Sequence, residues 1–334
     1  MSVKKLRIAV IGTGLIGSLH AEIYNENNLA ELVAVCDINK KAVKQVAKKN
    51  NCNYYFNYEE MLKNEALDAV SIATPESIRL KPCIMAAKKG LKILLEKPLG
   101  KKFNEIKNLV TRLKKIKAYV AVNFILHADP RFRKMKEEIK NNKIGNIVTY
   151  FARRRGNRLG IEYYAPWTDL LSSTLIHDIQ MILELSKSNP ERVFAEAVIR
   201  ECKKYNSHDA VVATLKFRDG SVASFETSWV LPKNQPEPLD PAFNVIGDQG
   251  SIIIEGSSLG MNILTNKQFI KPDLAHWPTI DSSVDGALKK NLDMFVNNAL
   301  NNKPPIVDLH SAQLAEKVVH SMKESIRLKK PIKL

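Results

Sequence analysis

The apolar run Leu6–Gly12 leads directly into the sequence G-T-G-L-I-G at residues 12–17. This is a G-x-G-x-x-G pattern at the junction of a predicted strand and a predicted helix. The first glycine permits a tight turn, Gly14 lets the backbone approach a pyrophosphate, and Gly17 lets the helix pack closely on the strand. Amide groups at the start of the helix then face the phosphate charge. The pattern therefore predicts a Rossmann domain that binds a dinucleotide.

The acidic residue Asp37 closes the second predicted strand, about 20 residues after the glycine pattern. A carboxylate at this position accepts hydrogen bonds from the adenosine ribose and repels a 2′-phosphate. Lys40 and Lys41 lie close enough in the sequence to weaken that preference. We therefore expect NAD(H) as the cofactor, with NADP(H) as the less favoured alternative.

The first third of the chain alternates short apolar runs with helical patterns. This alternation indicates βαβ units and a doubly wound parallel sheet, which makes the fold class α/β in this part. The expected strands are Leu6–Gly12, Leu32–Cys36, Ala69–Ala73, Ile93–Leu95 and Tyr119–Asn123. The expected helices are Ile16–Asn27, Asn39–Asn50, Ile78–Lys89 with Gly90 as its C-cap, and Asn104–Lys117.

Beyond residue 123 the pattern changes to strands in quick succession between a few helices, and Asp219-Gly220 signals a hairpin. This predicts an α+β domain with a large, mostly antiparallel sheet that has one open face. The expected helices are Pro130–Asn141, Asp169–Leu185, Val284–Asn301 and Ser311–Arg327. The expected strands are Gly145–Arg154, Arg192–Ile199, Ala210–Phe217, Ser221–Trp229, Phe243–Ile246 and Ser251–Glu255, with Pro232–Pro241 as a proline-rich loop.

Two domains follow from this division. Residues 1–123 are expected to form the NAD(P)-binding Rossmann domain, and residues 124–334 a substrate-binding and oligomerisation domain whose last helices can pack back on the first domain. Because a symmetric partner often buries an open sheet face, we expect a homodimer or a homotetramer.

The composition is that of a globular protein, with 45% hydrophobic and 26% charged residues. No stretch approaches the roughly 20 apolar residues of a membrane helix, and the amino terminus lacks a signal-peptide pattern, so a cytoplasmic location without a membrane partner is expected. The cysteines Cys36, Cys52, Cys83 and Cys202 have no metal or disulfide spacing. Free thiols and chemistry without a metal are therefore expected.

The formal net charge is +16, with lysines spread along the predicted helices. A solvated surface is favoured over a nucleic-acid surface, because aromatic residues that would stack on bases make up only 7% of the chain. The run Arg153–Arg155 alternates between the two faces of a predicted strand. One face could hold a substrate phosphate or carboxylate, or it could be a solvated edge, and both interpretations remain open.

The segment Glu96-Lys97-Pro98 follows the predicted strand Ile93–Leu95 at its carboxyl end, where open parallel sheets bind their ligands. A lysine there, followed by a proline that can adopt a cis bond, would lie where a nicotinamide ring is expected. From the residues alone, Lys97 is equally well explained as a surface lysine.

At this point the sequence resembles the Gfo/Idh/MocA family, which contains glucose–fructose oxidoreductase and inositol dehydrogenase-like proteins. The matching pieces are the glycine turn followed by His20, the turn at residues 73–75, Glu96-Lys97-Pro98, and I-H-D-I at residues 176–179. The resemblance covers essentially the whole chain.

The resemblance implies an NAD(P)-dependent dehydrogenase that acts on the CH–OH group of a sugar, cyclitol or sugar nucleotide. Lys97 would hydrogen-bond the reacting oxygen, and His177 would be the general acid/base. The implied cofactor-binding residues are Gly12, Thr13, Gly14, Leu15, Ile16, Asp37, Ile38, Ala73, Thr74, Pro75, Glu96, Lys97 and Asn123. The candidate substrate contacts are Lys97, His127, Trp167, Ser173 and His177, although His127 and Trp167 could equally serve packing, and His208-Asp209 is expected to be solvated.

Two positions depart from the family pattern. Sugar- and cyclitol-oxidising members often have an aspartate four residues before the histidine, one turn away on the same helix face, where this chain has Ser173. Arg79 stands where the T-P-x-x-x-H pattern usually has histidine. Neither Asp169 nor Asp178 is an obvious substitute for the missing carboxylate.

These departures keep an alternative open, namely an NAD(H)-binding sensor or regulatory subunit with degenerate catalysis. The basic surface and the run Arg153–Arg155 mildly favour a polyhydroxylated substrate that is anionic. Neither the exact substrate nor the direction of the reaction follows from the sequence.

Overall fold

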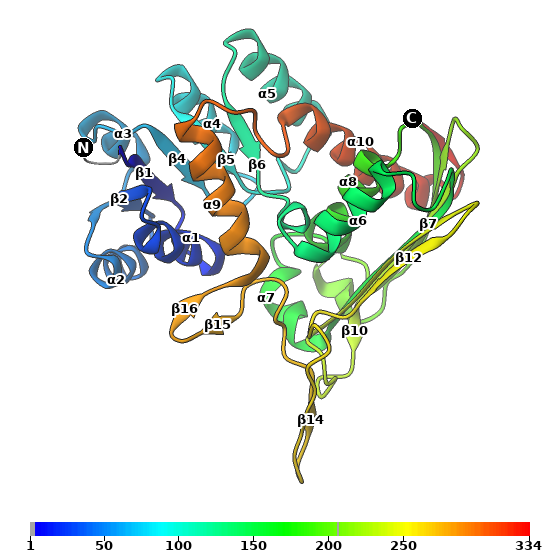
Figure 1. Cartoon of the computed structure of the whole chain (residues 1–334). Helices are drawn as coiled ribbons and strands as arrows, with labels where there is room; N and C mark the ends of the chain where they lie inside the picture. Colours follow the sequence, from blue (N-terminus) through cyan, green and yellow to red (C-terminus); the bar gives the residue numbers. More distant parts are fainter. Residues whose placement is uncertain (1–3, 206) are drawn as a thin grey trace. The chain divides into compact units, whose positions relative to one another are not determined.

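The computed structural model describes residues 4–205 and 207–334, and these form two compact units. The first unit comprises residues 4–125 together with Thr279–Gln313, and the second comprises Leu126–Pro278 together with Leu314–Leu334. Figure 1 shows the course of the chain. In the described part of the chain, no helix is long and apolar enough to cross a membrane. All four cysteines are free.

The first unit contains a parallel six-stranded sheet with the strand order β3-β2-β1-β4-β5-β6. This is the order of a dinucleotide-binding Rossmann sheet, so the α/β prediction is confirmed. The strands are β1 (Leu6–Ile11), β2 (Ala30–Cys36), β3 (Asn53–Tyr55), β4 (Ala69–Ile72), β5 (Lys92–Leu95) and β6 (Val120–Val122). Every residue of β4 and β6 is buried, as expected of strands that are covered on both faces.

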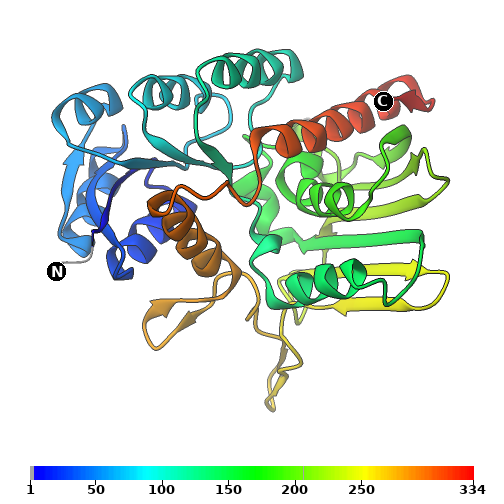
Figure 2. The ribbon, with the colours of Figure 1, turned by 45° about the horizontal axis from the view of Figure 1, so that its top comes forward.

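Helices cover both faces of this sheet, with α3, α4 and α5 on one side and α1, α2 and α9 on the other (Figure 2). Asn39, expected as the first residue of α2, is instead its N-cap and accepts hydrogen bonds from the amides of Lys41 and Ala42. Gly90, predicted as the C-cap of α4, lies one residue later, because the C-cap is Lys89; the φ of Gly90 is +75°. The helices are α1 (Leu15–Glu26), α2 (Lys40–Asn50), α3 (Tyr58–Asn64), α4 (Leu80–Lys88), α5 (Phe103–Lys115) and α9 (Gly286–Leu300).

Helix α9 belongs to the Rossmann unit although it lies far along the chain. Leu288, Leu292 and Phe295 are buried in the same apolar cluster as Ile8 of β1 and Tyr24 of α1. Asn27 donates a hydrogen bond to Asp293 at 2.7 Å at the edge of this contact. The core of the first unit is therefore complete only with a segment from the last sixth of the sequence.

The second unit contains a seven-stranded sheet with the order β12-β11-β7-β10-β9-β8-β17. Only β7 and β10 pair in parallel, so the prediction of a mostly antiparallel sheet is confirmed. Asp219-Gly220 forms the turn between β9 and β10 as predicted. The strands are β7 (Ile147–Asn157), β8 (Pro190–Val198), β9 (Ala210–Phe217), β10 (Val222–Leu231), β11 (Leu239–Gly247), β12 (Ser251–Glu255) and β17 (Ile332–Lys333).

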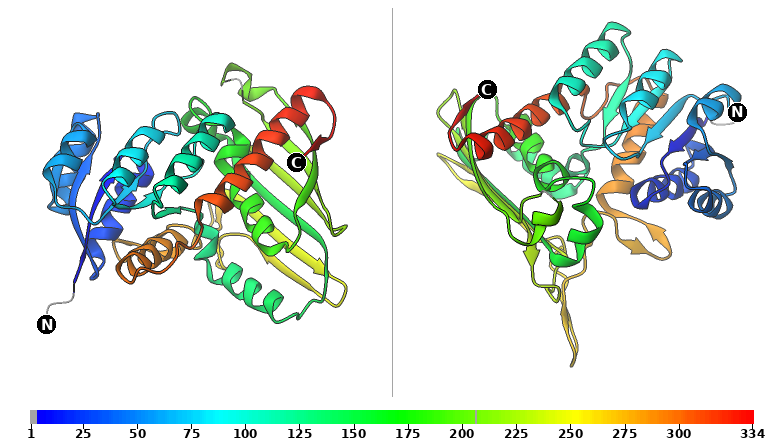
Figure 3. Two further views of the ribbon diagram at one scale, coloured as in Figure 1. Left: turned by 90° about the horizontal axis from the view of Figure 1, so that it is seen from above. Right: turned by 180° about the vertical axis from the view of Figure 1, so that it is seen from behind.

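The two faces of this sheet differ. One is packed beneath α6, α8 and the later part of α10, whereas the other carries no helix of the described chain (Figure 3). Val212 and Ile253 on the open face are 57% and 63% exposed. The helices are α6 (Pro130–Lys140), α7 (Ile161–Tyr164), α8 (Ile176–Leu185) and α10 (Leu309–Leu328), with the short 3-10 helices η1 (Ile125–His127), η2 (Arg158–Gly160) and η4 (Glu201–Tyr205).

Several expectations need correction. The segment Leu171–Leu175 (η3) is a π-helix rather than the start of a continuous α-helix. The proline-rich loop is shorter than expected, because β11 begins at Leu239 and includes Pro241. The elements β3, α3, α7 and β17 were not predicted. Two short hairpins were not predicted either: β13 (Ile263–Leu264) with β14 (Phe269–Ile270), and β15 (Thr279–Ile280) with β16 (Ser283–Val284).

Candidate functional site

In the glycine turn between β1 and α1, neighbouring atoms of the chain leave no room for a Cβ atom at two of the glycines, but they do leave room at the third. A Cβ atom on Gly12, whose φ is +96°, would lie 2.6 Å from the carbonyl oxygen of Ala73. A Cβ atom on Gly17 would lie 1.9 Å from the carbonyl oxygen of Gly12. A Cβ atom on Gly14 would meet nothing of the described chain within 4 Å. The absence of a side chain at Gly14 therefore leaves open space beside the turn, which fits the close approach of a pyrophosphate.

The first turn of α1 is open to a ligand. Its N-cap is Gly14, and no side chain of the described residues makes a capping hydrogen bond. The free amide groups and the helix dipole place partial positive charge at this end. Leu15 and Ile16, both predicted to bind the cofactor, are the first residues of this helix. The open space and the positive helix end together suit the phosphates of a dinucleotide.

Asp37 lies beside this turn. Its Oδ2 accepts hydrogen bonds from the backbone amide of Thr13 at 2.6 Å and from the hydroxyl of Thr13 at 3.1 Å. Its Oδ1 accepts from the backbone amide of Asn39 at 2.9 Å. Ile38 is 83% exposed next to it, and the Lys40 ammonium lies 5.3 Å from the ring centroid of Phe56. The carboxylate is thus held at the carboxyl end of β2, where the adenosine ribose is expected.

The hydroxyl group of Thr74, near the carboxyl end of β4, is buried without a hydrogen-bond partner among the described residues. Thr74 lies two residues after the end of β4 and is 8% exposed, and the amide of the intervening Ala73 donates to the carbonyl oxygen of Ile11 at 2.8 Å. Buried hydroxyl groups are normally hydrogen-bonded, so this one points to a missing polar partner such as a bound ligand. Thr74 and Pro75, both predicted to bind the cofactor, therefore line the same strand edge as the glycine turn.

Glu96 is a buried carboxylate at the carboxyl end of β5. Its Oε1 accepts a hydrogen bond from the Asn123 side chain and lies 3.3 Å from Nε2 of His20. Burial by itself would raise the pKa of Glu96, but the contacts with His20 and Asn123 and the charge of Lys97 outweigh it and hold the pKa below its usual range. The structure thus brings two predicted cofactor-binding residues, Glu96 and Asn123, into direct contact.

Two further residues complete this buried network. His20 Nδ1 lies 2.7 Å from the hydroxyl of Ser71, and the Asn291 side chain donates to Asn123 Oδ1 at 2.6 Å. His20 is one of the residues that carry the family resemblance, but none of its contacts was predicted. Asn291 was not predicted, because the expectation that the last helices can pack back on the first domain named no residue that would contact Asn123.

Lys97 follows Glu96, and the Lys97–Pro98 peptide bond is cis. The Arg79 side chain binds the chain on both sides of this lysine. Its Nη1 donates to the carbonyl oxygen of Glu96 at 2.8 Å and also to that of Pro98. Its Nε donates to the carbonyl oxygen of Thr74 at 3.2 Å. Sequence reasoning identified Arg79 only as a departure from a pattern and did not predict these contacts.

In the second unit, His177 is the second residue of α8 and Ser173 lies in the preceding π-helix. A turn of π-helix takes more residues than an α-helical turn. The expected relation of Ser173 and His177, one α-helical turn apart on the same face, is therefore altered. Asp178 is engaged elsewhere, because Arg154 donates to both of its oxygens, at 2.7 and 2.9 Å.

The π-helix η3 before His177 is stabilised by contacts of Asp169 with Ser172 and Lys323. Asp169 accepts hydrogen bonds from the amide of Ser172 at 3.0 Å and from the ammonium of Lys323 at 2.6 Å. Burial by itself would raise the pKa of Asp169, but Lys323 and Ser172 outweigh it and lower this pKa. Ser173 also donates its backbone amide to the carbonyl oxygen of Asp169 at 2.8 Å. Asp169 therefore stabilises the start of η3.

His127, predicted as a substrate contact, lies in a buried network. It is 3% exposed, and its Nε2 is 2.6 Å from Oε1 of Gln180, while its Nδ1 is 3.4 Å from the Lys136 ammonium. Burial lowers the pKa of His127. Since both ring nitrogens have neighbours within the second unit, these contacts favour a packing role.

Trp167, the other candidate substrate contact, is 41% exposed. Its indole nitrogen donates to the carbonyl oxygen of Tyr163 at 2.6 Å. Its ring lies 6.2 and 6.1 Å from the rings of Tyr163 and Tyr164. The three rings form an aromatic cluster that leaves a face of the indole accessible.

The arginine run is already paired within the second unit. Arg153 and Arg155 lie on the open face and both bind Asp240, at 2.7 and 2.9 Å. Arg154 lies on the covered face and binds Asp178. The alternation of faces is confirmed, but the interpretation that this run receives an anionic substrate group loses its support. Asp209, expected to be solvated, is instead buried and accepts the amides of residues 200–202.

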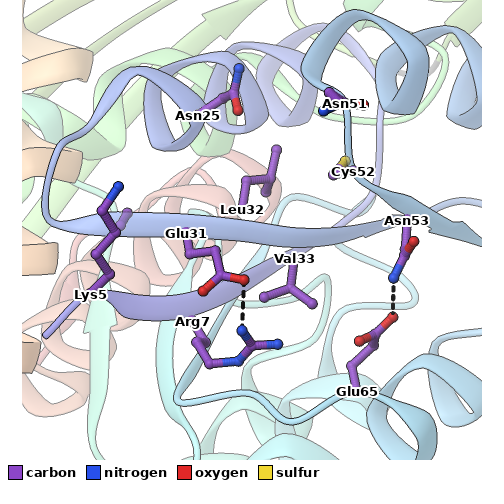
Figure 4. A pocket seen from close by; sticks show the side chains of 11 residues that line it. Lys5, Arg7, Asn25, Glu31, Leu32, Val33, Asn51, Cys52, Asn53 and Glu65 are labelled. Carbon is purple, nitrogen blue, oxygen red and sulfur yellow. Dashed lines mark hydrogen bonds and ion pairs between the residues drawn. The ribbon is translucent and has the colours of Figure 1, made fainter.

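One hollow of the described chain lies away from these residues. It has a volume of about 520 Å³ and lies at the amino ends of β1 and β2 (Figure 4). Arg7 pairs there with Glu31 at 2.6 Å, and Asn53 donates to Glu65 at 2.8 Å. Because ligands of such sheets bind at the carboxyl ends, this hollow is not the candidate site.

The chain is similar to known proteins along most of its length. Residues 6–124 match an oxidoreductase family with an NAD-binding Rossmann fold, and residues 132–253 match the Gfo/Idh/MocA C-terminal domain. Myo-inositol 2-dehydrogenase from Thermotoga maritima is 24% identical over 334 residues, which cover 98% of each chain. The NAD(+)-dependent scyllo-inositol 2-dehydrogenase from Bacillus subtilis is 26% identical over 337 residues, which cover 99% of this chain and 96% of the relative.

A solved structure shows that the likeness extends to the fold. Scyllo-inositol dehydrogenase from Lactobacillus casei, with bound NAD(H) and scyllo-inositol, superposes with a TM-score of 0.86. The sequences are 18% identical, and the superposition covers 99% of each chain. At this identity the similarity establishes a shared architecture.

Proposed function

Since the chain belongs to the Gfo/Idh/MocA family of NAD-binding oxidoreductases, we propose that it is an NAD(H)-dependent dehydrogenase acting on a secondary hydroxyl group of a cyclitol or sugar. The observation that carries this proposal is the set of groups at the carboxyl edge of the Rossmann sheet. Open space beside Gly14, the unpartnered hydroxyl of Thr74 and the braced Glu96-Lys97-Pro98 segment all lie along this edge.

The bound nicotinamide supplies the hydride acceptor for alcohol oxidation and the donor for the reverse reaction. The residues of this chain would position the carbinol carbon and manage one proton. Lys97 donates a hydrogen bond to the reacting oxygen and stabilises its negative charge as the C–H bond breaks. His177 takes the hydroxyl proton as the carbonyl forms, and returns it in the reverse direction.

NAD(H) is the cofactor that these residues favour. The Asp37 carboxylate is fixed by Thr13 and Asn39, so it can accept hydrogen bonds from a ribose and repel a 2′-phosphate. Lys40 is the nearest candidate to attract a 2′-phosphate, and its ammonium lies over the Phe56 ring. NADP(H) therefore remains the less favoured cofactor.

The proposed substrate is a neutral cyclitol or sugar. Relatives over the whole chain are named as inositol dehydrogenases. The arginines that could have bound a substrate anion are paired with Asp240 and Asp178. A phosphorylated or nucleotide-linked sugar is therefore disfavoured relative to the free polyol.

The test is the change in nicotinamide absorbance with NAD and NADP separately, across inositol isomers, free sugars and sugar nucleotides. We expect turnover with NAD and a cyclitol or free sugar. Lys97→Ala should lower kcat by at least about 100-fold, because charge stabilisation at the reacting oxygen is lost, while NADH still binds. Turnover by Lys97→Ala close to that of the wild type would contradict the assignment. Tight NADH binding without turnover of any substrate would favour the sensor alternative.

The open face of the second sheet suits a second copy of the chain. Val198, Val212, Ile246 and Ile253 on this face are between 46% and 63% exposed. On the same face, Arg153 and Arg155 are paired with the carboxylates of Asp240 and Glu226. A two-fold partner placed there would cover the apolar side chains. The proposed oligomer is therefore a homodimer through this face, or a homotetramer that contains it.

A further inference from the structure

Arg79 is a buried arginine at the N-cap of α4. It is only 5% exposed, although an arginine side chain is always charged. Burying a charge is costly unless the group is paired or hydrogen-bonded. The contacts of this guanidinium therefore indicate what the residue does.

The guanidinium donates hydrogen bonds to three backbone carbonyl groups in two loops. Its Nη1 donates to Glu96 and to Pro98, which flank Lys97 on its two sides. Its Nε and Nη2 both donate to Thr74. A single side chain thus ties the loop after β5 to the loop after β4.

Both loops belong to the site proposed above. The first carries the lysine proposed to bind the reacting oxygen, and the second carries Thr74 and Pro75 beside the glycine turn. We propose that Arg79 is a positioning residue, which fixes the backbone around Lys97 relative to the turn that lines the cofactor. This inference rests on the proposed function for its effect on turnover, but the contacts are independent of it.

The shape of the guanidinium explains why another cation would not serve. Its N–H groups lie in one plane and point in fixed directions, so they can reach carbonyl groups on two loops at once. A lysine ammonium is a point charge on a flexible stem, and an imidazole has fewer N–H groups. Arg79→Lys should therefore keep the charge but loosen the loop around Lys97. A displacement of about 1 Å at a reacting group can cost about 100-fold in rate.

The first experiment compares Arg79→Lys with a matched control, Arg7→Lys. Arg7 also donates to a backbone carbonyl, that of Ala66 at 2.7 Å, but at the opposite edge of the same sheet. We expect Arg79→Lys to lower kcat by about 10- to 100-fold, with changes below about threefold in KM and in NADH affinity. We expect Arg7→Lys to leave all three unchanged. Arg79→Ala should regain part of its kcat when guanidinium chloride is added below denaturing concentrations, and not when sodium chloride is added.

The second experiment measures hydrogen exchange of the protein without cofactor and needs no substrate. In Arg79→Lys, amides of Lys97 and Leu99 should exchange faster than in the wild type, whereas those of β1 should not. Faster exchange throughout the first unit would mean general destabilisation and would overturn the proposal.

The results for the two variants distinguish a failure of the positioning role of Arg79 from a failure of the dehydrogenase assignment. If Lys97→Ala is inactive but Arg79→Lys keeps kcat within about twofold of the wild type, the positioning role fails and the dehydrogenase assignment stands. If Lys97→Ala stays active, the assignment fails, and the exchange of Lys97 and Leu99 alone decides the role of Arg79. Unchanged exchange at these two amides would overturn it, and locally faster exchange would support it.

Discussion

At the scale of single residues, the glycines of the turn after β1 serve different requirements. Gly12 and Gly17 are required by backbone atoms of the chain, which a Cβ atom would meet at 2.6 and 1.9 Å. Gly14 has a φ of −68°, which alanine adopts freely, and faces open space. We therefore propose that a bound ligand requires glycine at position 14, whereas the packing of α1 requires it at position 17.

This difference predicts opposite effects for two alanine substitutions. Gly14→Ala should leave the melting temperature of the cofactor-free protein nearly unchanged and weaken NADH binding at least about tenfold, because the methyl group occupies the space of the pyrophosphate. Gly17→Ala should destabilise the protein by about 1–3 kcal/mol, because α1 must move away from the turn. Thermal melting and NADH fluorescence titration measure both effects. Normal NADH affinity in Gly14→Ala would show that the pyrophosphate does not lie at this turn.

At the scale of elements, buried strands were predicted more accurately than exposed ones. The strands β1, β4 and β5 were predicted within a few residues because buried parallel strands are mostly apolar. The strand β3 was missed because its three residues, Asn53–Tyr55, include two exposed ones and lack an apolar run. The π-helical geometry of η3 has no composition signal of its own, so the segment was predicted as ordinary α-helix.

The site was predictable to the extent that local patterns carry it. Strand-to-helix spacing identified the glycine turn and Asp37, and the resemblance identified Lys97. The contacts of Arg79 and Asn291 depend on loops and helices that meet only in the folded chain. A single sequence contains no period or spacing that would reveal such contacts.

The element η3 depends on its link to α10 through the Asp169–Lys323 ion pair, 2.6 Å long. Because the pKa of Asp169 is lowered in the folded chain, the stabilisation is complete above the ordinary carboxyl pKa of about 4 and is lost as pH falls through the lower folded value. Asp169→Asn should therefore cost about 1 kcal/mol at pH 7, and the difference from the wild type should begin to shrink below about pH 4 and vanish as the pH falls through the lower folded pKa of Asp169.

Thermal melting across this pH range is the measurement. The matched control is Glu138→Gln, which removes an exposed ion pair with Lys134 on α6 and should not change the melting temperature. A difference between Asp169→Asn and the wild type that stays constant with pH would exclude the ion pair as its cause.

At the scale of the whole molecule, the second sheet has a covered face and an open face with different chemistry. The covered face holds Arg154 against Asp178 of α8. The open face holds exposed apolar side chains between paired charges. Such a face is unusual for a protein surface in water unless a partner covers it.

The dimer proposed through this face makes a direct prediction. Val212→Lys combined with Ile253→Lys would place unpaired ammonium groups in the interface and should shift the mass measured by light scattering toward that of the single chain. Lys267→Glu on the distant loop between β13 and β14 is a charge-changing control and should keep the wild-type mass. A wild-type protein that is monomeric at micromolar concentration would rule out this use of the face.

The return of α9 to the first unit also bears on how the protein is made. A ribosome releases the Rossmann strands early, yet Leu288, Leu292 and Phe295, which complete their apolar cluster, emerge only near the end of translation. Until then the nascent chain exposes the surface of β1 and α1 that these residues later cover, and such surfaces attract chaperones or other nascent chains. Synthesis of residues 126–278 of the second unit thus precedes completion of the first, and a gene fragment that stops after β6 encodes a Rossmann sheet that lacks part of its own core.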